Sequence, residues 1–132
     1  MIAVTTTLRF RTAWLVSGWL FVALVVYLSL TPKPLSVDFG KGIKLDHMSA
    51  YAWLMLWFAQ VYCTRSSRLA AAAALVAMGI ALEYLQGLTD YRDFEYSDMA
   101  INAAGVALGL ACAALGLDRW LAWVDARLRL PW

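Results

Sequence analysis

Three pairs of polar residues stand out in this sequence because the members of each pair are three or four positions apart. The pairs are His47 with Tyr51, Glu83 with Gln86, and Asp98 with Asn102. Side chains at this spacing lie on the same face of a helix, so the three pairs could line one shared pocket. Imidazoles and carboxylates are common general acids and bases, and we therefore take His47 and Glu83 as the candidate catalytic residues.

The other polar residues near these pairs suit the binding of an anionic molecule. Lys44 and Arg92 could hold the anionic group, Arg92 through the forked hydrogen bonding of its guanidinium. The residues expected to orient these groups are Tyr51, Gln86, Asp98 and Asn102. Structural alternatives stay open for two of them, because Asp98 is a natural helix N-cap and Asn102 could hydrogen-bond between helices.

No metal or cofactor is expected at these residues. The predicted topology places Asp46, Asp93 and Asp98 near the single histidine, but with Lys44 and Arg92 beside them they form a poor donor set for zinc. A Ser-His-Asp arrangement is also disfavoured, because the serine nearest to the histidine is two positions away, on a different helix face.

Four apolar stretches must position the polar residues, and they are residues 13–30, 47–63, 69–88 and 99–117. Each has about the 17 to 25 residues that a helix needs to cross a bilayer. A span is either a helix or part of a closed barrel, and continuous apolarity without alternation argues against a barrel. The sequence predicts an all-α, polytopic membrane protein with a bundle of four transmembrane helices. Within the last stretch, Gly105 and Gly109 predict close helix packing.

The connections and the tail have distinct compositions. Residues 31–46 contain two prolines and two glycines and indicate a loop, residues 64–68 a short basic turn, and residues 89–97 a polar, aromatic loop. The tail predicts a short amphipathic helix in the membrane surface. Its apolar side comprises Trp120, Trp123, Val124 and Leu128, and the other side Asp118, Ala122, Asp125 and Arg129.

The distribution of charge predicts the orientation in the membrane. The N-terminal arm, the turn at residues 64–68 and the tail hold seven of the 11 basic residues, which places both termini in the cytoplasm. The polar pairs then lie toward the outside, with Glu83 roughly 6 to 8 Å from the outer end of its helix. A charged residue inside a span is costly, so Glu83 must be protonated or paired with Lys44, His47 or Arg92.

Composition supports a membrane protein and excludes some other classes. The chain is 63% hydrophobic and 15% charged, whereas soluble domains have about 25% charged residues. Its 132 residues include no long polar stretch and predict one domain, residues 1–132. The net charge of +2 and the scattered basic residues argue against a nucleic-acid partner. The oligomeric state is not indicated.

Several of these residues form extended motifs. Residues 44–51 read KLDHMSAY, with the shape K-x-x-H-x-x-x-Y, and residues 83–86 read EYLQ, with the shape E-x-x-Q. Arg92 and the pattern D-x-x-x-N-x-x-G-x-x-x-G at residues 98–109 follow. Over residues 44–109 the chain resembles the VanZ-like family, departing at Ile43, where that family often has aspartate. The resemblance implies a bacterial cytoplasmic-membrane protein of the cell envelope; the family's namesake is associated with low-level resistance to the glycopeptide teicoplanin.

These features predict an outward-facing polar pocket that binds a lipid headgroup or a lipid-linked glycan and could modify it. Membrane lipids or a lipid-linked envelope precursor are then the expected partners. Enzymatic activity stays open; in an enzyme, Glu83 would be the general acid or base and His47 would share the proton transfer. The alternative is a non-catalytic binding or assembly protein whose polar layer is structural. A transporter is less favoured, because four spans without repeats leave little room for alternating access.

Overall fold

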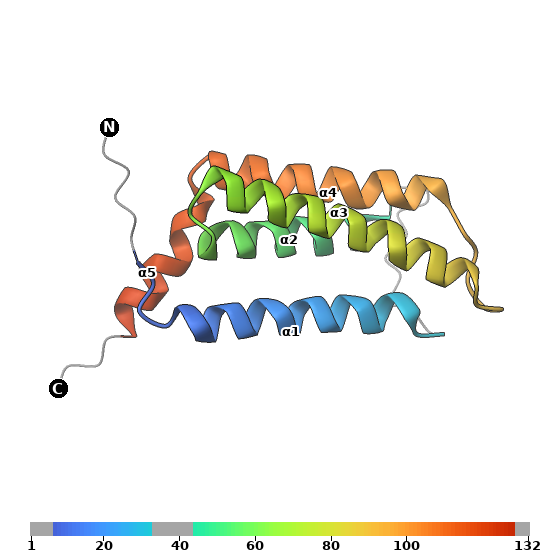
Figure 1. The fold of residues 1–132 in the computed structure, drawn as a ribbon, viewed down its shortest axis with the longest axis horizontal. Helices are drawn as coiled ribbons and strands as arrows, with labels where there is room; N and C mark the ends of the chain where they lie inside the picture. The colour runs from blue at the N-terminus through green and yellow to red at the C-terminus, as the bar shows by residue number, and fades with distance from the viewer. Residues whose placement is uncertain (1–6, 33–43, 129–132) are drawn as a thin grey trace.

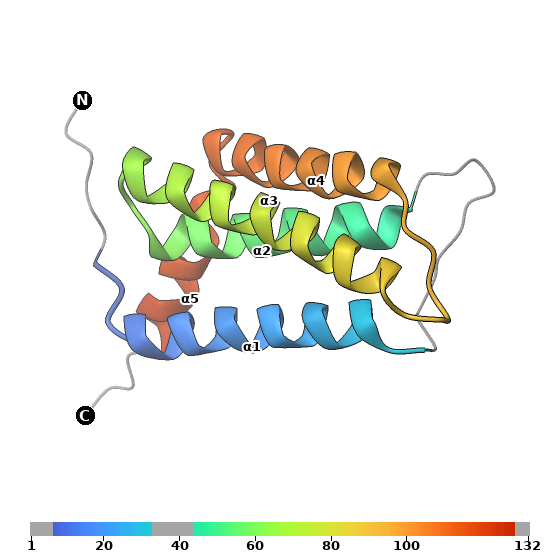
Figure 2. The ribbon, with the colours of Figure 1, turned by 45° about the vertical axis from the view of Figure 1, so that its right-hand side comes forward.

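The computed structural model describes residues 7–32 and 44–128, and the regular elements within them are helices. They are α1 (Arg11–Leu30), α2 (Leu45–Val61), α3 (Arg65–Gly87), α4 (Tyr96–Ala114), the 3-10 helix η1 (Leu117–Arg119) and α5 (Trp120–Arg127). Helices α1 to α4 run side by side along the long axis, and α5 lies across one end (Figure 1 and Figure 2). The predicted all-α class is confirmed for these residues.

Three of the four long helices have the length and apolarity of membrane spans, namely α1, α3 and α4. Helix α2 has 17 residues, and at about 1.5 Å per residue it is slightly shorter than the roughly 30 Å of a hydrocarbon core. The described residues therefore provide three candidate spans, compatible with a multi-pass membrane protein, and α2 falls just below the length that defines them.

Helix α2 is short, but it lies at the centre of the bundle. Leu54, Met55 and Ala59 on α2 have no exposed surface. They share one apolar core with Leu75 of α3 and Val106 of α4. The helix that contributes His47 and Tyr51 to the predicted site, and that Lys44 directly precedes, is therefore held on several sides by its neighbours.

Two glycines allow α4 to pack directly on the backbone of α2. A Cβ atom at Gly105 would lie 2.5 Å from the carbonyl oxygen of Met48, and one at Gly109 would lie 2.6 Å from that of Ala52. Only glycine permits so close an approach of two helix backbones. The packing predicted from the G-x-x-x-G spacing is confirmed.

Helix α5 binds the end of the bundle through Leu121 and Asp125. Leu121 is fully buried, and its backbone N–H donates to Gln60 Oε1 at 2.8 Å. Asp125 is 3% exposed and accepts hydrogen bonds from Trp14 Nε1 at 2.7 Å and from the backbone N–H groups of residues 9 and 10 at 2.8 and 3.0 Å. The assignment of Asp125 to the outward polar side is therefore wrong, because the start of α1 has free N–H groups that a carboxylate satisfies.

The helix limits differ from the predicted spans mainly at the N-terminal ends. Helix α3 begins at Arg65, because the Thr64 hydroxyl accepts the backbone N–H of Ser67 at 3.1 Å and caps the helix. Helix α4 begins at Tyr96, so Asp98 lies within its first turn and does not cap it. The N-cap alternative for Asp98 is thus wrong. Most of the first predicted loop, residues 33–43, and Arg129 of the tail lie outside the described residues.

Candidate functional site

Lys44 directly precedes α2 and connects it to the start of α4. Its Nζ lies 2.8 Å from Asp98 Oδ2 and 3.2 Å from Glu95 Oε2. Burial lowers the pKa of Lys44, but the hydrogen bonds and charges of Asp98 and Glu95 outweigh this effect and leave the pKa above its usual value. The positive charge of Lys44 therefore stabilises the fold at neutral pH, and this contribution is lost as the pH rises through the raised pKa. The charge of Lys44 is balanced within the protein.

His47 lies in the first turn of α2 and contacts α4. Its Nδ1 lies 3.2 Å from Asn102 Oδ1, and because an amide oxygen only accepts, Nδ1 is the donor. The other ring nitrogen, Nε2, is 3.9 Å from Asp46 Oδ2. The structure thus joins two sequence-predicted residues from different helices, and Asn102 orients the imidazole as an interhelical contact.

Glu83 lies inside the bundle. Only 1% of the residue is exposed, and its Oε1 accepts the backbone N–H of Glu95 at 2.7 Å. His47 and Lys44 are close enough for their charges to act on it, yet no cation in the described part of the chain forms an ion pair with it. The expected pairing with Lys44, His47 or Arg92 is therefore wrong. The loop before α4 folds back over α3 and supplies a backbone donor in place of a cation.

Tyr51 and Asn102 meet beside Gly79 on α3, one helical turn from Glu83. A Cβ atom at Gly79 would lie 3.3 Å from the Tyr51 hydroxyl oxygen and 3.3 Å from Asn102 Nδ2. Tyr51 and Asn102 are 3% and 4% exposed. Three helices thus contribute to one buried polar layer. The positions of these residues along the predicted helices indicate the same layer.

Gln86 and Arg92 bind the C-terminal end of α1. Gln86 Nε2 donates to the carbonyl oxygen of Ser29 at 2.7 Å, and Arg92 Nη2 donates to that of Leu28 at 3.0 Å. The Tyr91 hydroxyl donates to the carbonyl oxygen of residue 30 at 2.9 Å. The last carbonyls of a helix lack hydrogen-bond donors within the helix, and these side chains provide the donors. Sequence patterns do not mark backbone acceptors, so no signal in the sequence indicates these contacts.

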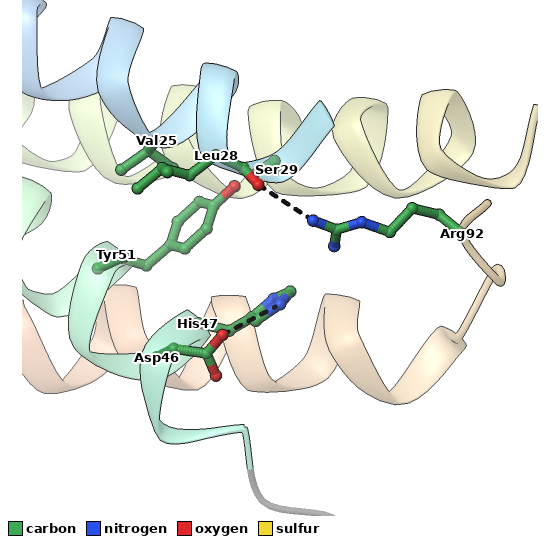
Figure 3. Close-up of a pocket in the computed structure, with 8 residues that line it drawn as sticks. Val25, Leu28, Ser29, Asp46, His47, Tyr51 and Arg92 are labelled. Carbon is green, nitrogen blue, oxygen red and sulfur yellow. Dashed lines mark hydrogen bonds and ion pairs between the residues drawn. The ribbon is translucent and has the colours of Figure 1, made fainter. Parts of the chain in front are cut away.

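A cavity of about 260 Å³ lies between α1 and the start of α2, beside the loop that carries Arg92 (Figure 3). It is lined by Val25, Leu28, Ser29, Asp46, His47, Ala50, Tyr51 and Arg92. The Arg92 Nε is buried and has no hydrogen-bond partner among the described residues. An unpaired buried donor is costly. The Arg92 side chain that lines the cavity also forms no ion pair with a described residue, so its positive charge has no counter-charge there.

The predicted site residues fall into two sets in the structure. His47, Tyr51 and Arg92 line the cavity. The others contact protein groups outside it, and they are Lys44, Glu83, Gln86, Asp98 and Asn102. Ser29 and Asp46 also line the cavity, although sequence reasoning assigned them no site role. Asp46 could have been found from its position beside His47, whereas nothing in the apolar first helix points to Ser29.

No group of three His, Cys, Asp or Glu side chains that could hold a metal occurs in residues 7–32 and 44–128. The chain matches no known family, no curated protein and no solved structure. The geometry of the cavity and of the polar layer behind it is what bears on function.

Proposed function

We propose that this chain is a VanZ-like protein of the bacterial cytoplasmic membrane, with four spans and both termini in the cytoplasm. Helix α2 lies at the same depth as three span-length helices and in the middle of them (Figure 2), and 17 residues is about the minimum for a span. Helix α5 keeps Trp123 56% exposed, with the Arg127 guanidinium 3.7 Å from the centre of its ring. Exposed tryptophan and arginine suit the cytoplasmic membrane surface.

Thiol labelling of single cysteines tests this orientation. In a variant without Cys63 and Cys112, a cysteine replacing the exposed Asp90 should react with a membrane-impermeant maleimide added to intact cells. A cysteine replacing the exposed Ser66 should react only after permeabilisation. The opposite labelling pattern would show that the orientation in the membrane is the reverse of the proposed one.

The function that the geometry supports best is the binding of an anionic amphiphile, a lipid headgroup or a lipid-linked glycan, from the extracytoplasmic side. The cavity between α1 and α2 carries this proposal, because it combines a polar and an apolar lining. Arg92 contributes a guanidinium that forms no ion pair with a described residue, and Val25 and Leu28 contribute apolar surface. A guanidinium recognises phosphate and carboxylate oxygens, while the apolar side suits the adjoining hydrocarbon chain.

Chemical modification of the bound molecule would depend on His47. Its imidazole lines the cavity and is held by Asn102 through Nδ1, so Nε2 could donate or accept the proton. Glu83 is not in the lining of the cavity and would act on the reaction only as a titratable carboxyl group behind His47. The link to the envelope and to teicoplanin resistance rests on the resemblance to the VanZ-like motifs.

A non-catalytic binding or assembly protein is the second candidate, and the contacts of the polar residues favour it. Lys44 pairs with Asp98 between α2 and α4, Glu83 binds the loop before α4, and Gln86 binds α1. In this case the polar layer only locks the helices together. The two candidates differ in whether Arg92 and His47 contact a ligand.

The imidazole of His47 provides a direct assay for binding, because it is the only histidine in the chain. In untagged protein in detergent, phosphatidylglycerol should shift the His47 ring resonances saturably, and phosphatidylethanolamine should shift them less. Arg92→Gln should weaken this binding by about tenfold to a hundredfold, since hydrogen bonds to charged groups contribute about 1.5 to 3 kcal/mol.

Tyr91→Phe is the matched control for Arg92→Gln. Tyr91 also holds the end of α1 by a hydrogen bond to a carbonyl, but it is not among the cavity residues. Its variant should keep the affinity of the parent. If both variants bind phosphatidylglycerol equally, or if no saturable shift occurs, Arg92 serves only the fold and the second candidate stands.

A further inference from the structure

A second groove lies at the other end of the bundle, where α3 begins. Its volume is about 430 Å³, within the range of about 300 to 1,000 Å³ that ligand pockets occupy. Helix α3 contributes the small residues Ala70, Ala71 and Ala74, whereas Trp19 of α1 and Phe58 of α2 contribute aromatic rings. The two rings meet edge to face at 5.8 Å. The groove is therefore bounded by aromatic rings on one side and by the small side chains of the alanines on the other.

Two arginines without ion pairs lie at the polar end of this groove. The Arg11 guanidinium is 5.8 Å from the centre of the Tyr62 ring, and Tyr62 lines the groove. Arg65 is the first residue of α3, at the same end of the bundle as the lining residue Ser67. Both arginines are exposed, and neither forms an ion pair with a residue that the structure describes. The groove thus has one uncompensated arginine beside its lining, Arg11, and a second, Arg65, at the same end of the bundle.

We propose that this groove holds an acyl chain of an anionic glycerophospholipid, with its phosphate bound by Arg11 and Arg65. Helices α1 and α3 are candidate spans, so the groove between them faces the hydrocarbon of the bilayer. In such a lipid a phosphate is followed by a long unbranched chain. The phosphate would lie at the arginines and the chain along the apolar lining. A neutral lipid or an apolar helix would leave both arginines without a counter-charge. This site is separate from the cavity near His47.

Two alanines on α3 offer a matched pair of variants. Ala74 lines the groove, whereas its neighbour Ala73 is equally exposed but is not part of the lining. Ala74→Leu should place a branched side chain in the space that the acyl chain occupies. Ala73→Leu adds the same group elsewhere on the surface of the same helix.

Photolabelling with a lipid probe tests the proposal. The protein is placed in nanodiscs of phosphatidylethanolamine with a small fraction of phosphatidylglycerol that carries a diazirine on one acyl chain. Labelling should concentrate on Trp19, Phe58 and the first half of α3. It should fall about tenfold in Ala74→Leu and stay unchanged in Ala73→Leu. A double variant Arg11→Gln and Arg65→Gln should lower the labelling about thirtyfold, because each lost charge weakens lipid binding by about tenfold or less.

The result that would overturn the proposal is labelling spread evenly over the lipid-facing surface and insensitive to Ala74→Leu. Cross-linked dimers that Ala74→Leu abolishes would also overturn it, because a second copy would then occupy the groove. If Ala74→Leu fails to fold, the double arginine variant decides, since it alters only exposed groups. Arg92→Gln should leave this labelling unchanged, which separates failure here from failure of the proposed headgroup cavity.

Discussion

Glu83→Ala is expected to lower the free energy of unfolding by about 3 kcal/mol. The carboxylate is 1% exposed and accepts the backbone N–H of Glu95 at 2.7 Å. Alanine would leave that N–H without an acceptor and would open a void in the polar layer. The change can be measured by reversible denaturation in mixed micelles, followed by circular dichroism. A loss below about 1 kcal/mol would contradict the structural role of this hydrogen bond.

Glu83→Gln then separates a catalytic role of the site from a binding or structural role. The amide oxygen can still accept the Glu95 N–H, so stability should stay within about 1 kcal/mol of the parent, while the titratable carboxyl group near His47 is lost. If the proposed modification of a lipid or glycan takes place and His47 transfers a proton in it, this variant should lose most of that activity. General acid or base groups contribute about 10² to 10⁴ in rate. A folded Glu83→Gln protein with full function would leave only the binding or structural role.

Gly109→Leu should destabilise the protein by about 3 kcal/mol, at the upper end of overpacking costs. A Cβ atom at this position would lie 2.6 Å from the Ala52 carbonyl oxygen and 2.7 Å from Met55 Cβ. Both obstacles belong to the centre of α2, which cannot move without disturbing its contacts to the other helices. The same denaturation assay measures the loss.

Ala107→Leu is the control for Gly109→Leu, because it adds bulk to an exposed position of the same helix. It should change the free energy of unfolding by no more than about 0.5 kcal/mol. If the two variants were equally stable, α2 and α4 would not be in backbone contact, and the frame that holds Lys44 and His47 against Asp98 and Asn102 would be wrong.

Much of the fold follows from the sequence because apolar length and glycine spacing are direct signals of helices in a bilayer. The four long helices coincide with the apolar stretches, and Gly105 and Gly109 identify the contact between α2 and α4. Asp125 could not be placed in the same way. Its helix position indicates an outward side chain, but the start of α1, more than 100 residues away in sequence, lies beside it. Tertiary contacts of this kind have no local pattern.

The candidate site was predictable where two side chains recognise each other. His47 and Asn102 belong to two of the polar pairs and have complementary groups, and they meet at 3.2 Å. Glu83 and Arg92 have opposite charges, and the sequence places Arg92 in the loop above Glu83, but both bind backbone groups instead. Backbone donors and acceptors occur at every residue, so a sequence does not show which of them will compete for a side chain. The division between cavity and supporting layer therefore emerges only from the structure.

The central claim, that an anionic headgroup occupies the cavity between α1 and α2, can be tested by one solid-state NMR measurement. Protein labelled with ¹⁵N only in its single histidine is reconstituted in phosphatidylglycerol bilayers, and the dipolar coupling between the imidazole nitrogens and the lipid phosphorus is recorded. The account predicts a resolved coupling to His47 that disappears in Arg92→Gln and persists in Tyr91→Phe. A well-folded protein without such a coupling would contradict it.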